Sequence, residues 1–401
     1  MADQTAVQEA AQALFCALAD YNGASNIQSI FNTNTYPIYK TFKAHWNTEN
    51  SSVKINDVFS KHVHAPGVLI TDIESLFEKD NEWYRSSVSI AKTLVLDITD
   101  ISREFNKIKS PNWKDIFYVR GDSDIMKNIE ELFKIANKSQ ATTGGLILGD
   151  VNKWSPADIY FASDKAKTVI LNLLKDAKNN TITFSKMNSS LHELIDSGNL
   201  LTVSLKKQPN KVTIIKVNFN RKTELEQIQK YGYYGTSDWK PYEENTPQTR
   251  DLKIYYQKGS TKDFIKTRHD PSGSMKLTTE VQSSSALARG GSIGSAVSLV
   301  SLLKTVDSAF ASKFLAVYNN GQNELKKRLN DKDMMVLRSK DKKQFDTLRG
   351  KMSAMLVTNK IFPMYIKWLD ADKKRADAYI HMIYQYVTSR TELSGEYIIA
   401  K

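Results

Sequence analysis

Cysteine is almost absent from this sequence of 401 residues, since Cys16 is the only one. A single cysteine excludes an intramolecular disulfide and every zinc site built from several thiolates. It is typical of proteins that work in a reducing compartment.

Long uninterrupted apolar runs are also missing. No window approaches the roughly 18 consecutive apolar residues that a transmembrane helix requires. The start of the sequence, Met1-Ala2-Asp3-Gln4-Thr5, has neither the basic beginning nor the apolar stretch of a secretion signal. We therefore expect a cytoplasmic protein without a membrane partner.

Two common catalytic signatures are lacking. No G-x-S-x-G elbow is present, and neither His192 nor His269 has an evident partner for a serine nucleophile. The pairs Gly144-Gly145 and Gly290-Gly291 lack the G-K-[ST] ending of a phosphate-binding P-loop. These absences argue against a serine hydrolase and a P-loop nucleotide hydrolase, and no small-molecule cofactor is evident.

Positive charge is abundant. The sequence has 56 Lys and Arg against 44 Asp and Glu, which gives a net charge of +12 and a pI near 9.3. With 41% hydrophobic and 25% charged residues, its composition is that of an ordinary globular protein. The basic balance favours contact with nucleic acid or another polyanion.

The hydrophobic pattern changes twice along the chain. Helical periodicity dominates residues 1–140 and returns over residues 301–401, whereas residues 141–300 alternate as strands do. We predict an α/β (α+β) protein with a helical N-terminal domain, a central core with one mixed sheet, and a helical C-terminal region. Within the core, Gln208-Pro209-Asn210 is predicted to join two strands as a hairpin. Beyond Gly395 we expect only a short apolar tail.

The candidate chemistry lies at two predicted strand ends. Asp158 begins one strand, and Lys206 and Lys207 end another. A carboxylate offers hard oxygen ligands to a divalent metal, and an ammonium stabilises negative charge developing on a phosphodiester. The alternative is a buried strand pair whose polar residues only cap its ends.

These strands carry a resemblance to a known superfamily. Pro156-x-Asp158, followed by Ser204-Leu205-Lys206, resembles the PD-(D/E)xK nuclease core, in which an acid and an acid-x-Lys tripeptide bind Mg²⁺ beside the scissile phosphate. The resemblance implies a restriction-endonuclease-like sheet with Asp158 and Lys206 as catalytic residues. Ser204 stands at the position of the second acid, so the candidates to replace it are Glu224 or Glu226 after the strands, or Glu280, and Asp158 and Glu280 are the predicted metal ligands.

A second resemblance covers about 150 of the 401 residues. Three segments resemble uncharacterised proteins of tailed bacteriophages: Asn-Lys-Trp-Ser-Pro-Ala-Asp-Ile at residues 152–159, the Ser-Leu-Lys-Lys strand end, and Ala-Arg-Gly-Gly-Ser-Ile-Gly at residues 288–294. This resemblance implies a phage protein in the host cytoplasm or the virion, with DNA and other virion proteins as partners.

Four further residues are candidates for contacting nucleic acid. Lys207 follows the second strand, and Arg289 precedes two glycines whose backbone N–H groups suit a phosphate. Tyr233 and Lys240 belong to a segment where aromatic and basic residues alternate, as on a base-stacking surface. The alternatives are a plain glycine hinge and aromatic packing onto the sheet.

Two hypotheses follow for the function. The first is a Mg²⁺-dependent phosphodiesterase, a DNA endonuclease of a phage. The second is a virion structural or assembly protein that keeps the fold without catalysis. A non-catalytic DNA-binding module is a third, weaker reading.

Overall fold

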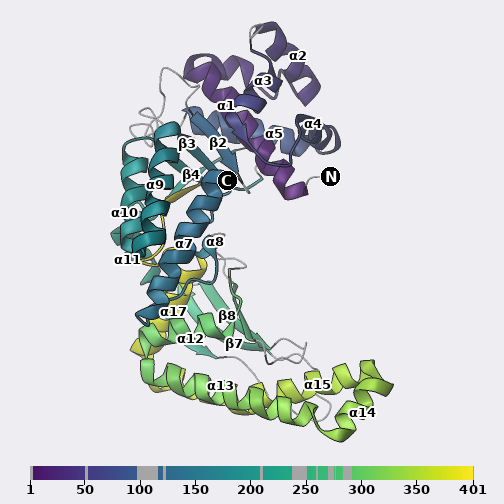
Figure 1. Ribbon diagram of the computed structural model, residues 1–401, viewed down its shortest axis with the longest axis vertical. Coiled ribbons are helices and arrows are strands. Elements are labelled where there is room, and N and C mark those ends of the chain that lie inside the picture. The colour runs from purple at the N-terminus through teal and green to yellow at the C-terminus, as the bar shows by residue number, and fades with distance from the viewer. Residues whose placement is uncertain are drawn as a thin grey trace. The chain divides into compact units, whose positions relative to one another are not determined.

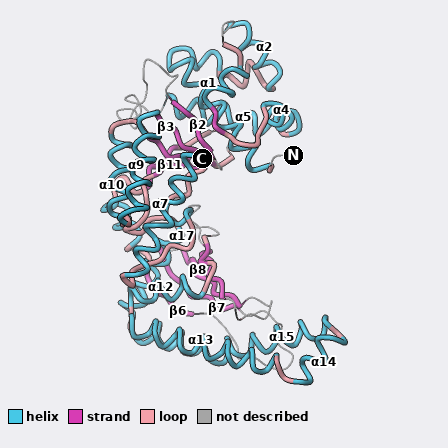
Figure 2. The backbone as a smooth tube through the Cα atoms, in the orientation of Figure 1, coloured by secondary structure: helices cyan, strands magenta, loops and turns pink. Residues whose placement is uncertain are grey.

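The protein has a mixed α/β fold with two separate sheets (Figures 1 and 2). This computed structural model describes residues 3–49, 53–96, 116–120, 123–207, 211–236, 251–258, 261–269, 275, 277–282 and 291–400. The chain divides into two compact units. Unit 1 comprises residues 1–139, 154–219 and 393–401, and unit 2 comprises residues 140–153 and 220–392.

The sheet of unit 1 is mixed and has the strand order β1-β2-β3-β4-β11-β5. Strands β2, β3 and β4 are antiparallel neighbours, and β11 runs parallel to β4 and antiparallel to β5. The bounds are Val63–His64 for β1, Ile116–Arg120 for β2, Ile159–Ser163 for β3, Leu200–Leu205 for β4, Ile214–Val217 for β5 and Tyr397–Ala400 for β11.

One face of this sheet packs against the N-terminal helices. Ile159, Phe161 and Val203 from the sheet join the same buried cluster as the apolar residues of these helices. Phe15 lies at the centre of an aromatic group, with its ring centroid 5.1 Å from that of Phe42. The helices are α1 (Gln4–Ile30), α2 (Tyr39–Glu49), α3 (Ile55–His62), α4 (Ile70–Lys79) and α5 (Asn81–Leu96).

Helices α9 (Asp164–Asn180) and α10 (Phe184–Asp196) contact strands β3 and β4. Both begin at a side-chain cap, because Ser163 accepts from the N–H of Ala166 and Thr183 from that of Lys186. Helix α7 (Asp124–Thr142) packs beside them through the rings of Phe133 and Phe184, whose centroids are 5.8 Å apart.

Unit 2 contains an antiparallel sheet in the order β10-β9-β8-β7-β6, covered by helices α12 and α17. The strands are β6 (Gly232–Thr236), β7 (Asp251–Lys258), β8 (Thr261–His269), β9 (Leu277–Gln282) and β10 (Ser292–Ile293). Residues 151–153 of the short helix α8 (Val151–Trp154) also belong to unit 2. The other helices of unit 2 are α11 (Arg221–Ile228), α12 (Ala296–Val306), α13 (Ser308–Leu329), α14 (Lys332–Lys340), α15 (Lys342–Leu356), α16 (Phe362–Ala371) and α17 (Lys373–Val387), with a π-helical turn at Val357–Ile361. In the ranges given above, none of the helices combines the length and apolar character needed to cross a bilayer.

The prediction of a mixed α/β protein is confirmed, but the prediction of one central sheet is wrong. Strands of residues 159–217 and of residues 232–293 belong to different sheets. The hairpin prediction is also wrong, because β4 and β5 are separated by β11. The four residues Tyr397–Ala400 are therefore a buried interior strand and not a tail.

Candidate functional site at the start of strand β3

Asp158 lies where β3 begins and is tied to the end of β4. Its backbone N–H donates to the carbonyl of Val203 at 2.9 Å, which extends the β3–β4 ladder by one residue. Its Oδ2 accepts two hydrogen bonds, one from the N–H of Leu205 at 2.6 Å and one from the hydroxyl of Ser204 at 3.2 Å. The carboxylate therefore touches the residue at the position of the second acid in the nuclease motif.

Ser204 and Lys206 differ strongly in exposure. Ser204 is only 3% exposed, whereas Lys206 is exposed. The N–H of Lys206 donates to the carbonyl of Ala400 at 2.9 Å, so β11 fixes the backbone at the end of β4. The antiparallel register thus brings the backbone at the end of β4, just before Lys206, next to Asp158.

A further acid that the sequence reasoning missed acts on the same region. Burial raises the pKa of the Tyr160 phenol, and the negative charges of Glu130 and Asp158 raise this pKa further. Tyr160 follows Asp158 by two residues on β3, and Glu130 belongs to α7. No local signal singles out Glu130, since it is one of several acids on an amphipathic helix.

Two of the predicted replacement acids have basic partners within unit 2. Glu224 on α11 forms an ion pair with Arg390, with 3.0 Å between oxygen and nitrogen. Glu280 on β9 lies opposite Lys266 on β8 and forms an ion pair with it at 3.0 Å. Each carboxylate is therefore already engaged by a cation of its own unit.

Two of the predicted nucleic-acid contacts also have partners within the protein. The ammonium of Lys207 lies 3.0 Å from a carboxylate oxygen of Asp80 and 3.0 Å from one of Glu82. The Tyr233 hydroxyl donates to Asp370 of α16 at 2.5 Å. Arg289 and Lys240 lie outside the described residues.

The carboxylates in the described part of the chain form no ready metal cage. Across the described ranges, no three His, Cys, Asp or Glu side chains gather closely enough to hold a metal ion. At Asp158 the neighbouring ligand atom is the hydroxyl of Ser204. This donor set fits Mg²⁺ only in its common mode, in which one or two carboxylates share the ion with waters and substrate phosphates.

Comparisons with protein-family models, with curated proteins and with solved structures gave no match to this chain.

Proposed function

We propose that the chain is a phage DNA-interacting protein whose unit 1 carries a metal-dependent phosphodiesterase site at Asp158. The observation that carries the proposal is the contact between the carboxylate of Asp158 and the hydroxyl of Ser204 across β3 and β4. Two residues far apart in the sequence thus meet at the positions that the nuclease motif gives to its two acids. The protein would act in the host cytoplasm or the virion.

Each residue has a distinct role in this proposal. Asp158, held in place by the N–H of Leu205, would supply a charged oxygen ligand. The exposed ammonium of Lys206 would neutralise charge on the scissile phosphate as it develops.

Mg²⁺ would be held by Asp158 together with oxygens of water and phosphate. When bound, the ion would supply an activated water and neutralise phosphate charge. Because the protein offers few carboxylates here, we expect Mg²⁺ to bind weakly without DNA and more tightly with it.

The test is cleavage of plasmid DNA with Mg²⁺ or Mn²⁺, beside an EDTA control. Asp158→Asn keeps the size of the side chain but loses its charge, so we expect cleavage to fall to background with the fold intact. Lys206→Ala should slow cleavage by about 10²–10³-fold while metal binding persists. Unchanged cleavage in both variants would remove these residues from the site.

A second test restores the acid that the motif lacks. Ser204→Asp places a second carboxylate beside Asp158, where repulsion between like charges should destabilise the metal-free protein. Mg²⁺ should then raise the melting temperature of this variant more than that of the wild type. Ser204→Asn, of equal size and neutral, is the control and should show no such gain. Equal responses of both variants would argue against a metal at Asp158.

The second candidate is a non-catalytic virion structural or assembly protein. The two hydrogen bonds that Oδ2 of Asp158 accepts from β4 favour it, because they give the carboxylate a purely structural use. In that case the wild type would be inert with every divalent metal, and Asp158→Asn would change only stability or assembly.

A further inference from the structure

Positive charge is concentrated in one part of the C-terminal helices. Residues 324–351, which we call the basic arm, run from the end of α13 through α14 into α15. They contain ten Lys and Arg against five Asp and Glu, so these 28 residues account for five of the chain's net twelve positive charges.

Most acids of the basic arm already have local partners. Four of the five are engaged, two as helix N-caps and two in ion pairs: Asp331 caps α14, Asp341 caps α15, Glu324 binds Arg328 and Lys360, and Asp346 binds Arg349. These carboxylates neutralise few of the other cations of the arm.

Seven of the other eight cations of the basic arm face solvent, and the eighth, Lys351, is partly buried. Within the described residues, none of these seven forms an ion pair, and all seven have exposed side chains: Lys326, Lys327, Lys332, Arg338, Lys340, Lys342 and Lys343. A surface of this kind is electrostatically complementary to a polyanion.

Three of these lysines oppose the stability of their own helices. Lys332 is the first residue of α14, and Lys342 and Lys343 are the first two of α15. The first turn of a helix carries partial positive charge, so cations there are unfavourable and anions are favourable. These three lysines therefore do not stabilise their helices. Binding of an anionic partner would account for their positions.

Helix α14, in the middle of the basic arm, has a surface that suits a nucleic acid better than a membrane. Only Met334 of α14 is buried, so most of the helix surface is open, and a helix of about 10–12 Å diameter fits the major groove. Met335 and Val336 are its only large apolar side chains described as exposed, too few for an apolar face that enters lipid.

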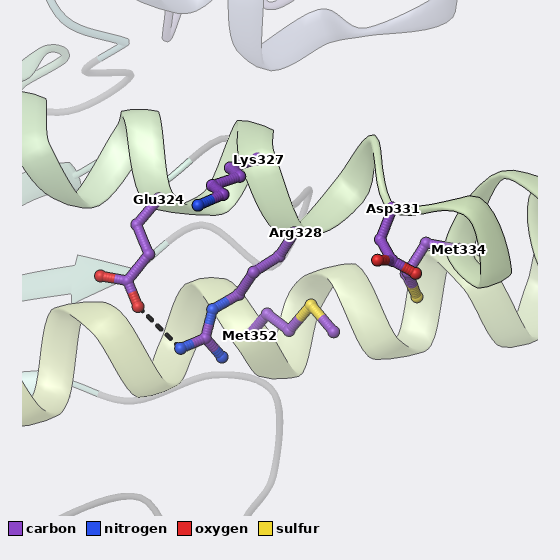
Figure 3. Close-up of a pocket in the computed structure, with 6 residues that line it drawn as sticks. All are labelled: Glu324, Lys327, Arg328, Asp331, Met334 and Met352. Atoms are coloured by element: carbon purple, nitrogen blue, oxygen red, sulfur yellow. Dashed lines mark hydrogen bonds and ion pairs between the residues drawn. The ribbon is translucent and has the colours of Figure 1, made fainter.

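A hollow of about 520 Å³ lies at the same place, between α13 and α15 (Figure 3). Lys327 and Arg328 line it together with Glu324 and Asp331, and Arg328 donates to Glu324 at 2.7 Å. Because its charges are balanced, the hollow itself does not select an anion. The cationic surface outside it does.

We propose that the basic arm binds the phosphate backbone of duplex DNA. This inference rests on the proposed DNA function, but it concerns unit 2 and involves neither Asp158 nor Lys206. The arm would hold the duplex by sequence-independent phosphate contacts, whose strength falls with salt because counterions are released on binding.

The test compares two triple variants of the full chain on a short duplex in EDTA, between about 50 and 200 mM salt. The first variant changes Lys332, Lys342 and Lys343 to Gln. The control changes three exposed lysines of unit 2 outside the arm to Gln: Lys304, Lys313 and Lys367. Both lose three charges, so a general effect of net charge weakens them equally.

For the arm variant, we expect the negative slope of log K against log salt to be shallower than that of the wild type by about 2–3. The control should keep the wild-type slope. The arm variant should also melt at the same or a higher temperature than the wild type, since it removes cations from helix N-termini. Equal slopes for arm variant and control would overturn the inference.

The outcome separates the two proposals. If the arm variant has a shallower salt dependence than the control and the wild type does not cleave DNA with Mg²⁺, the basic arm is a DNA-binding surface and the phosphodiesterase proposal is removed. If cleavage depends on Asp158 and the arm variant binds DNA as the control does, the phosphodiesterase proposal stands and the proposal for the basic arm is removed.

Discussion

Gly395 stands where an added methyl group has no room. A Cβ atom built on it would lie 2.8 Å from Cζ2 and 2.9 Å from Cε2 of Trp154. The indole cannot easily give way, because Trp154 is 2% exposed and its Nε1–H donates to Asn188 at 2.8 Å. Gly395 is held as well, since its N–H donates to the carbonyl of Trp154 at 2.9 Å and its own carbonyl accepts from Asn218 at 2.6 Å.

We therefore expect Gly395→Ala to lower the free energy of unfolding. Overpacking a well-filled interior costs about 1–3 kcal/mol. Replacing glycine by alanine returns about 0.4–1 kcal/mol by restricting the unfolded chain. The net loss should be about 1–2 kcal/mol, measured as a lower urea midpoint. Because Gly395 leads into β11, which holds the backbone of Lys206, DNA cleavage should also weaken if the proposed site is correct.

Gly294→Ala is the matched control, because a Cβ atom there meets nothing within 4 Å. It should leave stability unchanged or slightly raised. In a Trp154→Phe background the smaller ring leaves space, so Gly395→Ala should cost about 1 kcal/mol less than in the wild type. If Gly395→Ala behaves like the control, or costs the same in both backgrounds, the steric argument is refuted.

Three further predictions concern unit 1. Burial raises the pKa of Cys16 to about 12, so the native protein should resist thiol reagents at about pH 8, whereas the urea-unfolded chain should react fast. The hydrogen bond to Glu396 raises the pKa of His192, so the pair stabilises the fold below the ordinary histidine pKa of 6.5 and this stabilisation is lost as pH rises through the raised pKa. His192→Gln should thus cost about 0.2–1 kcal/mol under acidic conditions and nothing under alkaline ones, by urea midpoints. Ile398→Ala should cost about 2–5 kcal/mol in the same assay, because the side chain is fully buried in β11; a cost below about 0.5 kcal/mol would contradict its place in the core.

Several local features of this protein were readable from the sequence. The helical period over Ile125 to Ala136 predicts what the structure contains as α7, and the apolar runs at residues 158–162 and 200–206 correspond to β3 and β4. These signals are readable because they depend on neighbours within a few residues. The position of Asp158 at a strand mouth is of this kind, and so is that of Lys206 at a strand end.

Tertiary structure alone decided the partners of these elements. Nothing within Tyr397–Ala400 indicates that it inserts between β4 and β5, because its hydrogen-bonding partners lie about 180 to 200 positions earlier in the chain. The pairing of Glu224 with Arg390 is equally remote in sequence, and it gives this candidate ligand a partner in unit 2. Strand order and ion pairing are set by burial of whole faces and by long-range contacts, which a local pattern does not contain.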